Sequence, residues 1–398
     1  MYTRSATRRE YVEEIRSMTV HKCADTRLLF VISSLKRCGP VNQLYELIRN
    51  LDRSSFDVTV LTLKGEVDGN SRIADFSDMG VRLLSLGLTR WHVANVLVRM
   101  HTVLTSIQPH VVHSHGLLPD LAVSLVNTSA VHVCTIHSYC REDYVFSFGP
   151  CVGSLLSRVH LSILRRIEFP IACSSSVARK LEESHRLRVG VIWNGINTDV
   201  YAPVSDREKA HLRRTLGLPI DARIFIYTGK LSPLKNPMFL VQAFAAADLV
   251  GCLLLLIGDG PLREACAEQG VDSVLVTGQV DNVQDYLRAS DVYVSSSTTE
   301  GMPLGVLEAM ACGLPVLLSD IAAHRELVEG TPNVQGLFSL NDQQSLISLM
   351  GAYAREDLEE IGGSSRQKID TSFSAELMAS SYQTLYRDAL ASRRRKER

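Results

Sequence analysis

The sequence has no excess of either charge. In a chain of 398 residues, 42 Lys and Arg residues balance 43 Asp and Glu residues, and the formal net charge is −1. Binding to a nucleic-acid backbone depends on concentrated positive charge, so a nucleic-acid partner is not expected. With 45% hydrophobic and 21% charged residues, the composition is typical of a globular protein.

Long apolar runs are also missing. No stretch approaches the roughly 20 residues that span a bilayer. The first residues, MYTRSATRREYVEEIRSM, are charged throughout and have no apolar core, so a secretory signal is not expected. Residues 1–25 are predicted to be a poorly ordered tail. These absences together predict a cytoplasmic protein.

Neither a disulfide framework nor a metal-binding motif is present. The nine cysteines are an odd number, no Cys-x-x-Cys occurs, and most of them lie in apolar runs such as Val133-Cys134-Thr135. This usage predicts buried thiols in a reducing compartment. The sequence also contains no Asp-x-Asp pair. No metal and no resident cofactor are therefore expected.

Short β-branched and leucine-rich runs alternate with helical patterns along the whole chain. This alternation predicts an α/β fold whose parallel sheets are covered on both faces. The strand candidates of the first half are 27–33, 57–62, 110–113, 132–136, 171–174 and 189–193. Those of the second half are 224–228, 253–257, 273–276, 292–295, 316–319 and 336–338.

The two series of strands predict two doubly wound, Rossmann-like domains in tandem. We place the first over 26–195 and the second over 207–373, with a linker at 196–206 where turn residues cluster. A last helix is expected over 374–391, beginning at a capping Ser374, with a basic tail over 392–398. Ligands of such folds bind at the carboxyl ends of the strands, so a cleft between the domains is expected.

The segment 291–326 carries the most chemical information. A strand is expected to end at Ser295, a loop to hold Glu300 and Gly301-Met302, and a helix to begin near Pro303-Leu304. The start of a helix has unpaired N–H groups and a partial positive charge, which favour an anion. Glu300 and Glu308 stand on either side of this helix start, and carboxylates accept hydrogen bonds from sugar hydroxyls.

This segment resembles the Glu-x7-Glu motif of the retaining glycosyltransferases of family four, which have the GT-B fold. The resemblance covers roughly residues 26–391 and is strongest in the second domain. It implies that Glu300 contacts the sugar of a nucleoside-diphosphate donor and that Glu308 binds the ribose. Gly301, Met302, Pro303 and Leu304 would then line the donor site.

Three further loops fit the same resemblance. The loop from Gly229 to Asn236 has Lys230 and Lys235, which can stabilise a diphosphate as it gains charge. The family commonly has Arg at the position of Lys230, and lysine lacks the bidentate fork of arginine. The remaining residues that the resemblance places near the nucleotide are Gly258 and Gly260 of a Gly-Asp-Gly-Pro turn, and Gln279 and Val280.

The first domain is expected to bind the acceptor. The resemblance assigns a donor contact to Gly39, in a loop before a helix over 42–51, although Pro40 replaces the second glycine that relatives commonly have. It also places His137, in the context Thr-Ile-His-Ser, near the reacting sugar. A packed, structural side chain is the simpler interpretation for His115. The pair His113 and His115 has no apparent third metal ligand.

These residues predict a metal-independent, retaining hexosyltransferase with a UDP- or GDP-sugar donor and a glycan or lipid-linked acceptor. Polysaccharide or cell-envelope synthesis is the expected setting. The basic segment 155–166 and the basic end of the chain could rest on the cytoplasmic face of a membrane. Three alternatives stay open: a catalytically silent sugar-nucleotide-binding protein, a nucleotide-sugar epimerase on the same fold, and a nicotinamide-dependent oxidoreductase. The last alternative requires an intact Gly-x-Gly-x-x-Gly motif, which the sequence lacks.

Overall fold

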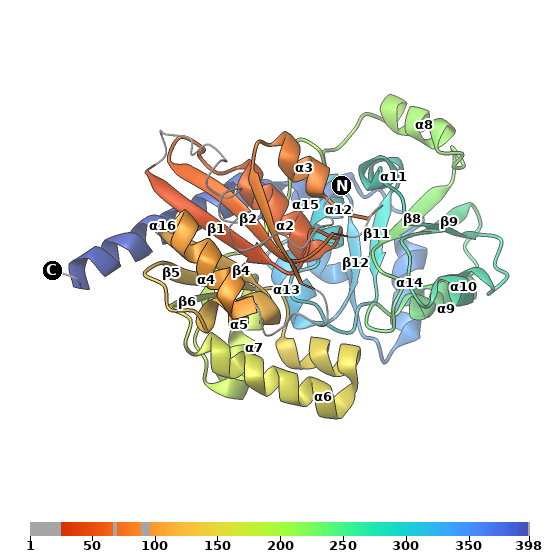
Figure 1. Cartoon of the computed structure of the whole chain (residues 1–398). Helices are drawn as coiled ribbons and strands as arrows, with labels where there is room; N and C mark the ends of the chain where they lie inside the picture. The colour runs from red at the N-terminus through yellow and green to blue at the C-terminus, as the bar shows by residue number, and fades with distance from the viewer. Residues whose placement is uncertain (1–24, 67–69, 89–95, 397–398) are drawn as a thin grey trace. The chain divides into compact units, whose positions relative to one another are not determined.

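The computed structural model describes residues 25–66, 70–88 and 96–396 (Figure 1). These residues form two compact units. Unit 1 contains the chain up to Cys173, Val177–Ile192 and the chain from Met378 onward; unit 2 contains Ser174–Ser176 and Trp193–Leu377. The tail expected over 1–25 lies outside the described residues except for its last residue. No helix in the described ranges is long and apolar enough to cross a membrane.

Unit 1 is built on a seven-stranded parallel sheet in the order β3-β2-β1-β4-β5-β6-β7. Its strands are β1 (Thr26–Ile32), β2 (Phe56–Lys64), β3 (Arg82–Leu88), β4 (Val111–His115), β5 (Val131–Ile136), β6 (Phe169–Ala172) and β7 (Gly190–Val191). Its helices are α2 (Gly39–Arg49), α3 (Ile73–Asp78), α4 (Val96–Ile107), α5 (Leu117–Ser124), α6 (Cys140–Leu164), most of α7 (Ser175–His185) and most of α16 (Ala375–Lys396). The first two residues of α7 belong to unit 2.

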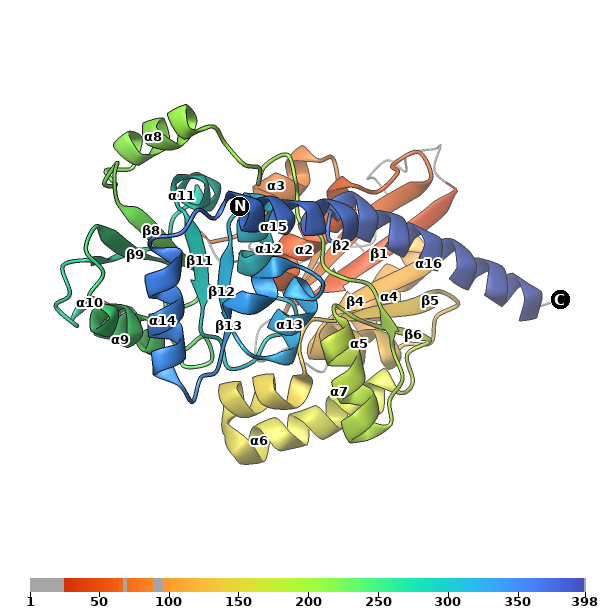
Figure 2. The same ribbon diagram turned by 180° about the vertical axis from the view of Figure 1, so that it is seen from behind.

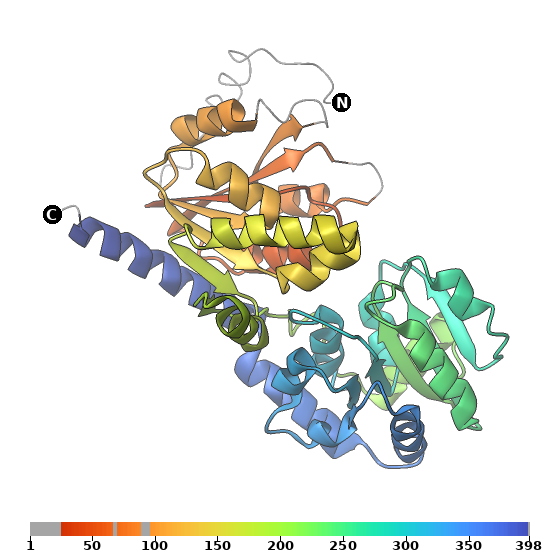
Figure 3. The ribbon, with the colours of Figure 1, turned by 90° about the horizontal axis from the view of Figure 1, so that it is seen from below.

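Helices cover both faces of this sheet, as a parallel sheet requires. One face packs against α2 and α16 through a core that includes Phe30, Leu44 and Tyr382. The other face packs against α4 and α5 through Val31 and Met100. Figure 3, in which α6 is yellow, shows that α6 consists of two helical pieces side by side. Its backbone leaves the helical conformation at Gly149, where φ is +78°.

Unit 2 contains a six-stranded parallel sheet in the order β10-β9-β8-β11-β12-β13 (Figure 2). The strands are β8 (Arg223–Thr228), β9 (Cys252–Ile257), β10 (Val274–Gly278), β11 (Val292–Ser295), β12 (Val316–Ser319) and β13 (Leu337–Phe338). The helices are α8 (Asp206–Thr215), α9 (Pro237–Ala247), α10 (Arg263–Ala267), α11 (Val283–Ala289), α12 (Leu304–Ala311), α13 (Ala322–Val328), α14 (Gln343–Tyr353) and α15 (Glu359–Ser372). A core that includes Phe225, Leu240 and Met350 joins one face of the sheet to α9 and α14.

The structure confirms the predicted fold class and corrects several boundaries. Strand β3 was missed, because this edge strand has alternating burial in place of a continuous apolar run. The helix expected over 42–51 begins at Gly39, since Cys38 takes an extended conformation and its carbonyl accepts a hydrogen bond from the N–H of Asn42 at 2.9 Å. Gly39 is therefore a helical residue and not a loop residue.

The last helix begins where the sequence predicts. Ser374 Oγ accepts a hydrogen bond from the N–H of Leu377 at 3.2 Å, which is the expected cap. The helix continues to Lys396, five residues beyond the predicted end, because nothing between Ala391 and Lys396 interrupts a helix. Residues 392–396 of the expected tail are thus helical.

Two glycines allow the backbone after β8 to touch the backbone after β9. At Gly258, φ is +141°, and a Cβ atom there would lie 1.9 Å from the carbonyl oxygen of Gly229. At Gly260, φ is +154°, and a Cβ atom would lie 2.3 Å from the carbonyl oxygen of Leu231. Neither neighbour is a flexible side chain, so these positions require glycine.

We expect Gly258→Ala to destabilise unit 2 by on the order of 3 kcal/mol, because the methyl group must displace backbone. Thermal unfolding followed by circular dichroism measures this effect as a lower Tm. Gly363→Ala is the matched control: Gly363 lies within helix α15 and nothing lies within 4 Å of the added Cβ, so Tm should stay constant or rise slightly. Equal melting temperatures for Gly258→Ala and wild type would contradict the close backbone contact.

Candidate active site

The loops after three neighbouring strands of unit 2 lie against one another. The N–H of Gly229 donates to the carbonyl of Ile257 at 2.9 Å, and the N–H of Gly258 donates to the carbonyl of Gly278 at 2.8 Å. These bonds bring the loops that follow β8, β9 and β10 together at the carboxyl edge of the sheet. The predicted nucleotide-contacting residues of these loops, Gly229, Gly258, Gly260, Gln279 and Val280, therefore share one edge.

The centre of this edge is an ion pair between Lys235 and Glu300. Lys235 Nζ contacts Glu300 Oε1, and Ser297 Oγ donates to the same oxygen at 2.8 Å. The Glu300 side chain is 10% exposed and that of Lys235 is 28% exposed. Each charge is partly removed from water and is compensated by the other.

The two loops that supply this ion pair are joined by further hydrogen bonds. Ser296 Oγ donates to the carbonyl of Asn236 at 2.7 Å, and the N–H of Thr298 donates to the carbonyl of Leu234 at 2.8 Å. The loop after β8 and the loop after β11 are thus held in a fixed register. The structure brings together Lys235 and Glu300, which stand 65 residues apart in the sequence.

Helix α12 begins four residues after Glu300. Pro303 is its N-cap residue, with φ −74° and ψ 111°, and the first helical residue is Leu304. The predicted start at Pro303 is therefore early by one residue: the residue has extended ψ, which its ring allows. The N–H groups of the first turn of α12 have no acceptor within the helix, so this end favours an anion.

The second predicted carboxylate lies within the helix. Glu308 is half-buried on α12. Burial first, and then the carboxylates of Glu308 and Glu300, raise the pKa of the Tyr293 phenol on β11. Both carboxylates therefore act on the same buried phenol. The structure places Glu300, Glu308 and Lys235 in one neighbourhood of unit 2.

Lys230 differs from Lys235. Its side chain is exposed, and its Nζ forms no ion pair with a residue that the structure describes. Its backbone is fixed, because the Tyr227 hydroxyl donates to its carbonyl at 3.2 Å. Lys230 thus lies on the same loop as Lys235, but its charge has no ion-pair partner within the described ranges.

Sequence reasoning missed His324, on α13. The ring is fully buried, its Nδ1 lies 2.8 Å from the carbonyl oxygen of Ser319, and its Nε2 has no hydrogen-bond partner among the described residues. Burial lowers its pKa, while the Glu300 carboxylate opposes that change and Lys235 adds to it. His324 therefore lies close enough to the ion pair to sense both charges. Its position five residues after the end of β12 was the available signal.

In unit 1, the predicted histidines lie at the carboxyl ends of β4 and β5. His115 Nδ1 is 3.0 Å from His137 Nε2, and the two rings stack with centroids 5.3 Å apart. Burial lowers the pKa of His137 to about 4, so the ring is neutral at pH 7. His113 uses both nitrogens in hydrogen bonds, with Tyr386 and Thr135 at 2.7 Å each. No group of three or more potential metal ligands occurs among the described residues.

Gly39, the other residue predicted in unit 1, is exposed at the first position of α2. Its N-terminal position in an 11-residue helix leaves its N–H without an intrahelical acceptor.

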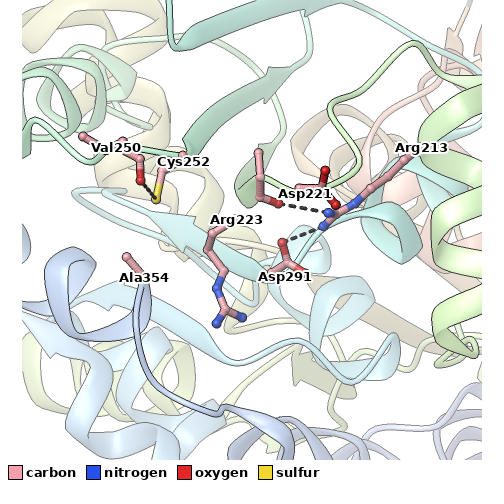
Figure 4. Close-up of a pocket in the computed structure, with 9 residues that line it drawn as sticks. Arg213, Asp221, Arg223, Val250, Cys252, Asp291 and Ala354 are labelled. Atoms are coloured by element: carbon pink, nitrogen blue, oxygen red, sulfur yellow. Dashed lines mark hydrogen bonds and ion pairs between the residues drawn. The ribbon is translucent and has the colours of Figure 1, made fainter.

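A pocket of about 390 Å³ lies at the opposite, amino end of the unit 2 sheet (Figure 4). The Arg213 guanidinium lines this pocket and points to Asp291, with Arg213 Nη2 2.6 Å from Asp291 Oδ2. The same guanidinium donates to the carbonyls of Ala289, Ile220 and Ala222. Because its donors are bonded to the protein, and because α/β folds bind ligands at the other end of their strands, we interpret this pocket as structural.

The fold is similar to those of solved glycosyltransferases. HepE from Anabaena, solved with UDP and glucose, gives a TM-score of 0.75 with 17% sequence identity over 90% of this chain and 99% of that chain. Sucrose-phosphate synthase from Thermosynechococcus elongatus gives a TM-score of 0.76 with 21% identity over 92% of this chain and 100% of that chain. These likenesses show two Rossmann-like domains of the GT-B class.

Two family models match the sequence. Residues 38–200 match glycosyltransferase family 4, and residues 222–353 match the glycosyl transferases group 1. The putative glycosyltransferase EpsF of Bacillus subtilis is 27% identical over 324 residues, which are 74% of this chain and 79% of the relative. The UDP-Gal:alpha-D-GlcNAc-diphosphoundecaprenol alpha-1,3-galactosyltransferase of Escherichia coli is 25% identical over 350 residues, 83% and 87% of the two chains. The chain belongs to glycosyltransferase family four, as the motifs indicate.

The buried histidines predict that acid destabilises unit 1. Burial lowers the pKa of His132 from 6.5 to about 4, with Asp120 opposing the change. Above pH 6.5 the ring is mostly neutral in both the folded and the unfolded chain. As pH falls from 6.5 toward 4 the unfolded chain takes up a proton first, so the free energy of unfolding falls, by on the order of 2 kcal/mol at pH 5.

Urea unfolding at pH 7 and pH 5 measures this loss. In His132→Gln, the difference in the free energy of unfolding between pH 7 and pH 5 should be smaller than in the wild type, whatever the variant does to stability at pH 7. His211→Gln, at an exposed position of α8, is the control and should keep the wild-type difference. An unchanged pH dependence in His132→Gln would show that this ring is not held neutral.

Proposed function

We propose that this glycosyltransferase transfers a hexose from a UDP- or GDP-sugar to a glycan or lipid-linked acceptor, with retention at the anomeric carbon and without a metal ion. The observation that supports it is the Lys235–Glu300 pair beside the first turn of α12 and Glu308. A cation, a helix start and two carboxylates match the groups of such a donor: a diphosphate, a sugar and a ribose.

Each residue has a separate role in the proposed reaction. Lys235 and the first turn of α12 stabilise the negative charge that develops on the departing diphosphate. Lys230 is long and exposed enough to add a second cation. Glu300 accepts hydrogen bonds from the sugar hydroxyls, and Glu308 accepts them from the ribose. His137, whose ring is neutral at pH 7, serves as a hydrogen-bond partner and not as a charge.

Two observations support the proposed acceptor class: the substrate named for a relative, and the surface of α6. The Escherichia coli relative is named for a diphosphoundecaprenol-linked substrate, which supports a lipid-linked acceptor here. The outer surface of α6 exposes apolar side chains, with Phe148 56% and Leu155 60% exposed. Between Tyr144 and Ile167 the sequence has no acidic residue, and Arg158 and Arg166 are exposed. We propose that this face rests on the anionic, cytoplasmic surface of a membrane.

The donor site is tested by thermal stabilisation with UDP, GDP, ADP, CMP and NAD. One nucleoside diphosphate should raise Tm by several degrees in the wild type, since a ligand that binds only the folded state stabilises it. Lys235→Ala should lose the diphosphate interaction and Glu308→Ala the ribose interaction, so both should abolish the shift. The nucleotide that stabilises then selects the sugar donors for turnover assays, in which retention is read from the anomeric signal of the product by NMR.

Stabilisation by NAD alone, or no stabilisation with both variants indistinguishable from wild type, would contradict the donor site. Gln269→Ala, at an exposed position C-terminal to α10, is a control for nonspecific effects on Tm. It should keep the full nucleotide-dependent shift.

The membrane contact is tested by flotation with vesicles. The wild type should bind vesicles that contain phosphatidylglycerol and not vesicles of phosphatidylcholine alone, and salt should weaken the binding. Leu155→Glu should reduce binding at least about fivefold, because it places a charge on the apolar face. Val250→Glu is the control, since Val250 is 98% exposed on unit 2 and should not matter. Equal binding by Leu155→Glu and Val250→Glu would contradict the assignment of this face.

A further inference from the structure

Glu326, on α13, binds two segments that are distant in the sequence. Its Oε1 accepts hydrogen bonds from the N–H of Ser175 at 2.7 Å and from Trp193 Nε1 at 2.7 Å, and its Oε2 accepts one from the N–H of Ser176 at 2.8 Å. All of these residues belong to unit 2, although Ser174–Ser176 are its only residues before Trp193.

All three bonds use the carboxylate as an acceptor. No lysine or arginine of the described chain forms an ion pair with Glu326. Its charge is instead compensated by the N–H groups at the start of α7, an 11-residue helix that begins at Ser175. A carboxylate at a helix start is favourable because it meets unpaired N–H groups and the positive end of the helix dipole.

The segment that Glu326 holds also contacts the candidate site. Ser174 is 1% exposed, and its Oγ donates to the carbonyl of Gly301 at 2.6 Å. Gly301 follows Glu300. Because a trans peptide is planar and its C=O and N–H point in opposite directions, this bond also fixes the direction of the N–H of Met302.

The second segment reaches the same loop independently. Asn194, next to Trp193, is 5% exposed. Its backbone N–H lies 3.2 Å from Met302 Sδ, and its Nδ2 donates to the carbonyl of Met302 at 3.4 Å. Both segments that Glu326 binds therefore touch Gly301-Met302, the first two of the three residues between Glu300 and α12.

We propose that Glu326 is a positioning residue of the donor site. By holding Ser174–Ser176 and Trp193, it fixes the Gly301-Met302 backbone, and this backbone sets the direction of Glu300 and of the first N–H groups offered to the diphosphate. Glu326 does not itself touch the donor. This inference rests on the proposed function, which places the sugar and the diphosphate at that loop.

The first test is Glu326→Gln. Glutamine keeps one acceptor oxygen, but its NH₂ group replaces the other oxygen and faces a backbone or indole N–H. At least one of the three hydrogen bonds to Ser175, Ser176 and Trp193 is therefore lost. We expect kcat with the sugar nucleotide to fall at least about tenfold, since a small misplacement of reacting groups has such effects. The Kd of the nucleoside diphosphate should change less than about threefold, because Lys235 and Glu308 are both unchanged and keep their proposed contacts with the diphosphate and the ribose. Glu329→Gln, an exposed glutamate that follows the same helix, is the matched control.

Hydrogen exchange followed by mass spectrometry reports on the loop without any substrate. In Glu326→Gln, peptides that cover 300–306 should exchange faster, while peptides of β8 and β9 should keep their wild-type rates. A faster loop in a protein that binds no nucleoside diphosphate would overturn the proposed function and leave the structural link intact. An unchanged loop, or a uniform acceleration over all of unit 2, would overturn the positioning role.

Ser174→Ala supplies a second route that does not disturb the carboxylate. It removes only the hydroxyl that binds Gly301, and it should accelerate exchange of the same loop and lower kcat in the same direction. Because both residues act through one segment, their effects should not be independent. The kcat of the double variant should be close to that of the more impaired single variant, and not lowered by the product of the two effects. Independent, multiplicative effects on kcat would overturn the inference even if Glu326→Gln alone is inactive.

Discussion

The neutralisation of Lys235 by Glu300 is the interaction on which the candidate site depends. Both groups are partly removed from water, and an ammonium or a carboxylate alone in that position would be strongly destabilising. The pair therefore ties the loop after β8 to the loop after β11. In the proposed reaction, a donor replaces this contact: the diphosphate takes the ammonium and the sugar hydroxyls take the carboxylate. Binding is then an exchange of partners for two charges already held in position.

Backbone contacts permit this arrangement. The loops after β8 and β9 approach so closely that Gly258 has no room for a Cβ atom, and Gly305 packs its α12 backbone against Tyr293 and Thr228 in the same way. The Tyr293 phenol is buried and donates to the carbonyl of Thr228 at 3.2 Å, and burial together with the Glu308 and Glu300 carboxylates raises its pKa further above the ordinary value. Close main-chain contacts thus join the loops of this edge that carry Lys235 and Glu300.

The sequence predicted what local pattern determines. Strands β11 and β12 were placed with their observed bounds, because fully buried parallel strands are short apolar runs with turn residues on both sides. Edge strand β3 was missed, since an edge strand has half its surface in water. The start of α2 was predicted too late, since Cys38 is an unusual N-cap residue. Ser174 and Glu326 were missed because their partners lie far away in the chain, and no spacing rule announces a contact across 127 or 151 residues. His324 bonds a nearby residue, but its burial near Lys235 and Glu300 depends on loops from other strands.

Two glutamates of unit 2, Glu300 in the loop after β11 and Glu326 on α13, show why residue type alone is not enough. Glu300 meets an ammonium and a hydroxyl, so it can exchange its partners for those of a ligand. Glu326 meets three N–H donors of the protein, two of them on the main chain, and these cannot leave without moving a helix start. The first arrangement suits a binding group and the second suits a support. In the proposed function, a carboxylate therefore contacts the donor at Glu300 and holds the backbone beside the donor at Glu326.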